Sequence, residues 1–416
     1  MIPDTVYRSP TERAVLILGF MTLFPGFFFY HFLLGMGLTR AFLGGYFTPM
    51  SLLFSLPIMV FYVREIRRDH RRLFPCEIYY GLFFVFFAAV IAANAVSGTS
   101  MVIVVAHMEG ILFMVNAFIL FKMIDFTKPH FRYPAILCLT GMSAIIICFS
   151  TEGMFRMDAL GLAKDPAALS TYQGLARSYL VTLLCVVAYT GSLTLRILLY
   201  LTGAASLFLN TARSEFVAML FVIPIIELYF SKKKLLFIVV LASTAALVIM
   251  NFSLIEEQLP NNRILELLDL SHSNSAILRH QMMAQAVQTI SAHPILGDYA
   301  SYETGHYAHN IFSAWVDLGI VGFVYLAALM ALPTASMLAR GYFTTHDQGD
   351  FILAFATACA TMLLLAKSHY FTDMLVGASI GAYSKYKYGT KYLEQRSRNA
   401  APVAVSGSPS ILQSQQ

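Results

Sequence analysis

The sequence predicts an all-α, polytopic membrane protein with about 12 transmembrane helices. Of its 416 residues, 58% are hydrophobic and only 12% are charged, whereas soluble domains carry about 25% charged residues. Apolar runs of roughly 20 residues, the length that crosses a bilayer as a helix, recur along the whole chain. The net charge is +5, but the 28 basic residues are scattered among many aromatic residues and form no basic cluster. The sequence therefore indicates no nucleic-acid partner.

The predicted helices follow one another in order, and each is an apolar run bounded by polar or basic residues. They lie at 14–36, 41–63, 77–96, 101–121, 133–150, 176–190, 193–209, 215–230, 235–252, 309–332, 350–366 and 371–388. Only Gly191-Ser192 separates the sixth run from the seventh. The first run is too long for a signal peptide and lacks a small-residue cleavage site, so we expect it to remain as a membrane helix.

The distribution of Lys and Arg predicts the orientation, because cytoplasmic loops hold the excess of these residues. With the N-terminus inside, 20 basic residues fall on inner segments and 8 on outer segments. We therefore expect both termini in the cytoplasm. The resulting domains are 1–252 (helices one to nine), 253–308 (an outer helical loop), 309–392 (helices ten to twelve) and 393–416 (a disordered tail rich in Ser, Gln and Pro).

The outer loop is expected to contain an amphipathic helix. Ser275 is a suitable N-cap, and apolar residues recur every four positions from Leu278 to Ile290. His293-Pro294 and Gly297 would end this helix. The loop would then cover the outer face of the bundle.

Two arginines on the outer side are candidate ligands for a diphosphate. Arg213 lies where the seventh run turns into the eighth, and Arg279 lies in the first turn of the loop helix, where the helix dipole favours an anion. Each guanidinium group can donate two parallel hydrogen bonds to phosphate oxygens, so two arginines suit a diphosphate. The alternatives are a snorkelling side chain for Arg213 and a surface ion pair with Glu266 or Asp269 for Arg279.

His309 is the candidate general base, because imidazole titrates near neutral pH and this residue begins the tenth run beside the outer loop. The alternative is a polar helix start without a catalytic role. Asp317 and Glu109 are carboxyl groups at membrane depth, which indicates either function or a protonated, hydrogen-bonded state. Possible supporting residues are Asn310, His306, His369 and Lys367. We expect neither a metal nor another cofactor, because the outer segments lack clustered carboxylates and the HExxH pattern.

These features resemble the superfamily of O-antigen ligases and O-antigen polymerases, within the C-type fold of polytopic glycosyltransferases. Three short motifs, in the same order, carry the resemblance: Thr211-Ala212-Arg213-Ser214; 279–286 with His293-Pro294-Ile295-Leu296-Gly297; and His309-Asn310 with 315–322. Together they span about a quarter of the chain. The family's Ser-Arg is Ala212-Arg213 here, and its Gly-x-Gly is Gly297-Asp298-Tyr299.

The resemblance implies a metal-independent glycosyltransferase in the bacterial inner membrane, with its active site facing the periplasm. Arg213 and Arg279 would hold an undecaprenyl-diphosphate-linked glycan, and His309 would activate the acceptor hydroxyl. The ligase reaction, with lipid A–core as acceptor, is favoured because one outer loop dominates. A polymerase for O-antigen or exopolysaccharide and a protein O-oligosaccharyltransferase remain open. From another class, a lipid or solute transporter would show interrupted helices near the midplane.

Overall fold

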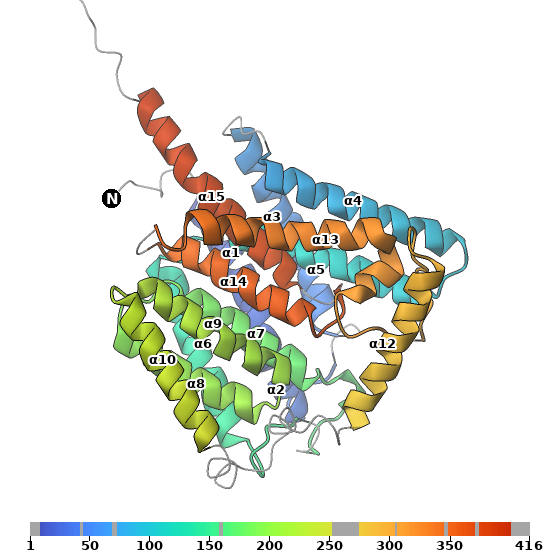
Figure 1. Cartoon of the computed structure of the whole chain (residues 1–416), viewed down its shortest axis with the longest axis horizontal. Helices are drawn as coiled ribbons and strands as arrows, with labels where there is room; N and C mark the ends of the chain where they lie inside the picture. The colour runs from blue at the N-terminus through green and yellow to red at the C-terminus, as the bar shows by residue number, and fades with distance from the viewer. Residues whose placement is uncertain are drawn as a thin grey trace, which may run out of the picture.

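The computed structural model describes residues 9–41, 45–68, 73–157, 161–251, 274–303, 306–344, 348–370 and 374–400, and the regular elements in these ranges are helices (Figure 1). The first predicted run forms α1 (Pro10–Met21), a π-helical turn η2 (Thr22–Gly26) and α2 (Phe27–Gly35). The others are α3 (Phe47–Arg68), α4 (Pro75–Val96), α5 (Met101–Met123), α6 (Pro129–Cys148), η4 (Pro166–Ala168), α7 (Tyr172–Val187), α8 (Leu193–Leu209), α9 (Arg213–Phe230), α10 (Lys234–Met250), α12 (Asn274–Ala292), α13 (Phe312–Arg340), α14 (Gly349–Leu365) and α15 (Leu375–Ala400).

The chain is an all-α membrane protein across the described residues. Six helical stretches are long and apolar enough to cross a bilayer: Pro10–Gly35, Phe47–Arg67, Pro75–Val96, Met101–Met123, Pro129–Cys148 and Phe312–Arg340. The shorter apolar helices α8, α10 and α14 have 17 residues each. At 1.5 Å per residue they extend about 25 Å, less than the roughly 30 Å of the hydrocarbon core. Every predicted run coincides with a helix, but the count of 12 spans stays a prediction.

Two of the predicted domain boundaries can be compared with helix ends. The amphipathic helix expected in the outer loop is α12, which begins one residue before the predicted cap Ser275. The first part of that loop, 252–273, with Glu266 and Asp269, lies outside the described residues. At the other end, α15 continues to Ala400, past the predicted start of a disordered tail at 393, and 401–416 lie outside the described residues.

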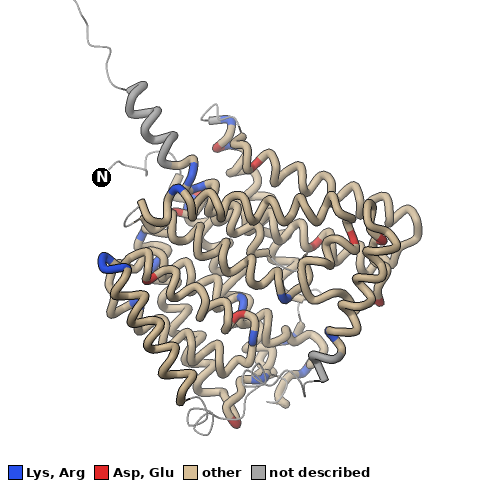
Figure 2. Tube along the Cα trace, viewed as in Figure 1, with Lys and Arg blue, Asp and Glu red and all other residues tan. Residues whose placement is uncertain are grey.

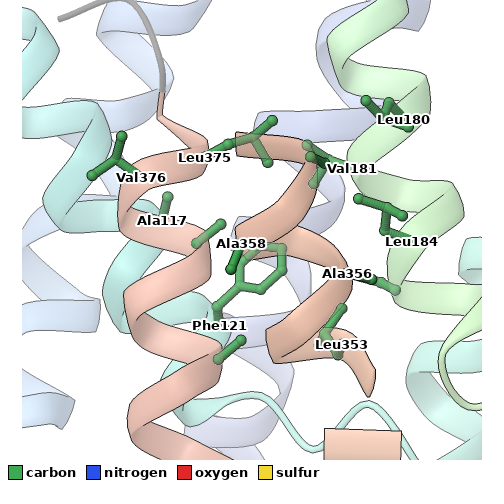
Figure 3. Close-up of a cluster of buried hydrophobic side chains, with 14 of the residues drawn as sticks. Ala117, Phe121, Leu180, Val181, Leu184, Leu353, Ala356, Ala358, Leu375 and Val376 are labelled. Atoms are coloured by element: carbon green, nitrogen blue, oxygen red, sulfur yellow. The ribbon is translucent and has the colours of Figure 1, made fainter. Parts of the chain in front are cut away.

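The centre of the bundle is formed where α15 packs against α5 on one side and α14 on the other. Figure 3 shows the apolar side chains of α5, α7, α14 and α15 filling the space between them. The close contact depends on glycine. A Cβ at Gly377 would lie 1.9 Å from the carbonyl oxygen of Met114, and one at Gly381 would lie 2.3 Å from that of Phe118. Small residues four positions apart let two membrane helices approach at backbone distance.

Ion pairs hold several helices together inside the bundle. Lys122 of α5 pairs with Glu77 of α4, which also accepts a hydrogen bond from Ser384 of α15 at 2.6 Å. The other pairs are Arg196–Glu227 at 2.6 Å, Lys385–Asp350 at 2.9 Å and Arg177–Glu215 at 3.0 Å. Figure 2 shows many of the Lys and Arg residues gathered along the upper and left margin of the view. In the four ion pairs, the attraction between the partners offsets the cost of removing their charges from water, so the first role of these pairs is structural.

We expect Gly381→Ala to destabilise the bundle, because its new methyl group meets backbone of α5 that cannot move aside. Overpacking of this kind costs about 1–3 kcal/mol. The readout is the unfolding temperature of the purified protein in detergent. Gly389→Ala is the matched control on the same helix, since no atom lies within 4 Å of its added Cβ. Equal unfolding temperatures for the two variants would contradict the proposed packing.

Candidate functional site

The site is built around a break in α13. At Gly319 the backbone leaves the helical conformation, with φ 66° and ψ −173°. The segment that follows α12 lies against this break and supplies the missing hydrogen bonds. The N–H of Asp298 donates to the carbonyl of Val316 at 2.7 Å, and the N–H of Ile320 donates to that of Pro294 at 3.2 Å. The broken helix and the loop therefore satisfy each other's backbone groups.

Glycine is required on both sides of this contact. A Cβ at Gly297, where φ is 73°, would lie 2.4 Å from the carbonyl oxygen of Val316, and one at Gly319 would lie 2.0 Å from that of Ile295. Gly297 and Gly319 thus allow the backbone of the segment 293–297 to approach the backbone of α13 closely. This approach places the loop residues 299–302 against the first two turns of α13.

Asp317 lies in those turns, and its side chain is fully buried. Its Oδ1 accepts the N–H of Ala300 at 3.0 Å, and its Oδ2 accepts the hydroxyl of Tyr302 at 3.1 Å. Two buried imidazoles face the same Oδ2. The Nε2 of His107, from α5, lies 3.9 Å away, and the Nε2 of His369, from the segment between α14 and α15, lies 3.8 Å away. We call His107, Asp317 and His369 the buried triad.

Aromatic rings connect the buried triad to His309. The ring of Tyr307 lies 4.3 Å from that of His369 and 4.8 Å from that of His309, centroid to centroid. Burial, and then the nearby positive charge of Arg279, lower the pKa of His309. Burial, His107 and His309 lower the pKa of His369 well below its usual value. Both imidazoles are therefore neutral near pH 7 and able to accept a proton or bind a metal ion.

The two predicted arginines lie on different helices, and Arg279 acts electrostatically on this region. Arg279 is exposed on α12, and its charge acts on His309. Arg213 is the first residue of α9 and is half-buried. Two residues later, Glu215 accepts a hydrogen bond from Arg177 of α7 at 3.0 Å. Burial raises the pKa of Tyr307, and the charge of Arg177, from α7, opposes that rise.

The remaining predicted residues have differing surroundings. Asn310 contacts both α13 and α12. Its Oδ1 accepts the N–H of Phe312, the first residue of α13, at 3.0 Å, and its amide nitrogen contacts the sulfur of Met283 of α12. His306 is exposed and lies 3.2 Å from Glu303. Lys367 is exposed at the end of α14, two residues before His369. Glu109 instead lines a second, mainly apolar cavity of about 270 Å³.

A cavity of about 530 Å³ lies between α12, the segment 301–308 and the beginning of α13. Gln281, Gln285 and Thr289 line it from α12, and Tyr302, His306 and Tyr307 line it from the opposite side. Amides and hydroxyls suit the many hydroxyl groups of a sugar. Tyr302 borders the cavity and also contacts Asp317 and His369, so one side chain links the cavity to the buried triad.

Sequence reasoning did not single out His107, Tyr299, Tyr302 or Arg177. The signal for His107 was present, because an ionisable residue inside an apolar run indicates function. The same rule led the sequence analysis to Glu109, which lies two positions after His107 on α5. In the structure Glu109 is half-buried, whereas His107 is fully buried and its Nδ1 lies 2.7 Å from the hydroxyl of Tyr299. The local sequence does not show which of the two side chains faces the core.

No family model matches the chain, and no similar curated protein is found. A function must therefore be inferred from the chemistry of the side chains. In the part of the chain that the structure describes, the candidate site combines a neutral histidine, the nearby positive charge of Arg279, and a cavity lined by polar groups. The grouping favours proton transfer next to an anionic substrate.

We expect Tyr302→Phe to destabilise the site, because it removes a hydrogen-bond donor from the buried carboxylate of Asp317. The loss of a donor to a buried charged group costs about 1–3 kcal/mol. Thermal or denaturant unfolding in detergent measures the effect. Tyr325→Phe is the control, because the hydroxyl of Tyr325 donates to a backbone carbonyl at an exposed position. The proposed role of Tyr302 is wrong if its variant unfolds no earlier than the control.

Proposed function

We propose that this chain is a metal-independent membrane glycosyltransferase of the O-antigen ligase type. It transfers a glycan from undecaprenyl diphosphate to lipid A–core at the periplasmic side of a bacterial inner membrane, with both termini in the cytoplasm. The observation that carries the proposal is the position of His309, a neutral imidazole that lies within the electrostatic influence of Arg279 and beside Tyr307, a residue of the polar cavity.

In the proposed reaction, His309 takes the proton of an acceptor hydroxyl as its oxygen attacks the anomeric carbon of the donor glycan. The bond between that carbon and the diphosphate oxygen breaks, and undecaprenyl diphosphate leaves with the electron pair. Arg213 and Arg279 stabilise the negative charge that develops on the leaving group, a role that a divalent cation fills in other enzymes. Attack from the opposite side would invert the anomeric configuration.

The position of Arg279 supports this division of roles. The same guanidinium that would bind the diphosphate lowers the pKa of His309, which keeps the base unprotonated at neutral pH. The ion pair between Arg177 and Glu215 would hold the first turn of α9, which carries Arg213. The acceptor would occupy the cavity beside α12, whose amide and hydroxyl groups can bind sugar hydroxyls.

Two alternatives within the same chemistry differ in the acceptor. An O-antigen or exopolysaccharide polymerase and a protein O-oligosaccharyltransferase would use the same donor and the same base. One observation favours a transporter instead, namely the break in α13 at Gly319 next to buried ionisable side chains, since interrupted helices bind substrates in many transporters. An assay with purified protein, a lipid-linked donor and each class of acceptor separates these functions.

We expect Arg213→Ala, Arg279→Ala and His309→Ala each to lower glycan transfer at least about 100-fold, because each removes a charge or base used in the transition state. Transfer to lipid A–core in detergent or liposomes is the readout. Arg340→Ala and His130→Ala are matched controls, since both residues are exposed at other helix ends. Adding Mg²⁺ or a soluble chelator should not change the rate. Full activity in all three variants would refute the enzymatic proposal.

We expect Arg279→Gln to move the acid limb of the pH–rate profile to higher pH. Removing the positive charge beside His309 stabilises its protonated form, which raises its pKa, so the base is lost at a higher pH than in the wild type. The profile is measured on the residual activity. Arg279→Lys keeps the charge and should leave the limb in place. A limb that moves to lower pH, or moves equally in both variants, would contradict this coupling.

A further inference from the structure

The buried triad has the composition and geometry of a metal site. One ligand atom from each of His107, Asp317 and His369 lies within 4.8 Å of the others, and the three residues are buried. They come from α5, from α13 and from the segment before α15, so they are brought together only by the fold. Two imidazoles and one carboxylate form the ligand set that divalent zinc or iron binds, leaving further coordination positions open.

The charge balance of Asp317 differs from that of other acids in the bundle. Glu77, Glu215, Glu227 and Asp350 each pair with a Lys or Arg. Across the described residues, no Lys or Arg lies within ion-pair distance of Asp317, and two imidazoles take that place. A buried carboxylate needs a compensating charge or a proton. A divalent cation between the three side chains would supply that charge.

The groups behind the triad orient it as the outer shell of a metal site does. With Nε2 of His107 on a metal, its Nδ1 carries the proton and donates to the hydroxyl oxygen of Tyr299, 2.7 Å away. The carboxylate of Asp317 is fixed by the N–H of Ala300 and the hydroxyl of Tyr302. Tyr302 also borders the 530 Å³ cavity, and its hydroxyl lies 3.3 Å from the Nε2 of His369.

We propose that His107, Asp317 and His369 bind one divalent transition-metal ion, with Zn²⁺ as the representative ion. Bonds of about 2.0–2.1 Å to a tetrahedral ion place ligand atoms roughly 3.4 Å apart. The two separations from the Oδ2 of Asp317, 3.8 and 3.9 Å, are close to this value. All three ligand atoms lie within 4.8 Å of one another, so the two imidazoles would approach each other by up to about 1.4 Å to close around the ion.

This ion would be structural and separate from the proposed transfer chemistry. Its ligands are buried beneath Tyr302 and Tyr307, whereas the proposed diphosphate ligand Arg279 is exposed on α12. The ion would fix His369, on which Tyr307 packs, and so hold the floor of the cavity. A soluble chelator in the transfer assay would remove free cations, while a fully buried ion would remain bound.

The test is the metal content of the full-length protein, purified in detergent with a tag that does not bind metal and dialysed against metal-free buffer. Elemental analysis is expected to find about one transition-metal ion per chain in the wild type. Binding of Co²⁺ to protein stripped of metal should produce visible d–d absorption. His107→Ala, Asp317→Asn and His369→Ala should each lower the bound metal at least about tenfold.

His31→Ala is the matched control and should keep its metal. His31 is also a buried histidine, but its Nδ1 accepts the N–H of Ser170, far from the triad in sequence and outside it in space. Wild-type protein that is metal-free and takes up neither Zn²⁺ nor Co²⁺ would overturn the proposal and identify the triad as a hydrogen-bonded network. This result is independent of misfolding in any variant. Arg279→Ala should retain the metal while losing transfer, so the two proposals fail separately.

Discussion

The carboxylate of Asp317 is the constraint on which the surrounding structure depends. A buried charge without partners would cost several kcal/mol, and this residue has no exposed surface. Its partners come from α5, from the loop after α12 and from the segment between α14 and α15. Satisfying one side chain therefore fixes the relative positions of elements that are more than 200 residues apart in sequence.

The break in α13 makes this arrangement possible. Backbone groups at membrane depth must find partners inside the protein, and a helix interrupted at Gly319 leaves some of them open. The loop from His293 to Ala300 fills that need, and in doing so it brings α12 to the side of α13 (Figure 1). As a result, the charge of Arg279 acts on His309, although 30 residues separate them in the sequence.

Much of the fold could be predicted because its signals are local. Apolar runs mark the helices of the bundle, and the spacing from Leu278 to Ile290 marks α12. The candidate site could be predicted only in part. Arg279 stood out as a basic residue of the outer loop, and His309 stood out as an imidazole at the start of a predicted membrane helix. The burial of His107, the role of Tyr302 and the break at Gly319 depend on contacts between distant segments, which no local pattern encodes.

The charged side chains of this membrane protein fall into two groups: those in ion pairs between helices, and those that act on the candidate site. Glu77, Glu227 and Asp350 are neutralised by direct partners on neighbouring helices, so they hold the bundle together and have little remaining attraction for a ligand. Arg279 is exposed, and its positive charge acts on the imidazole of His309. An exposed guanidinium can attract an anionic substrate, and its charge also keeps the imidazole of His309 unprotonated and able to accept a proton. Binding and base activation would then share one electrostatic cause.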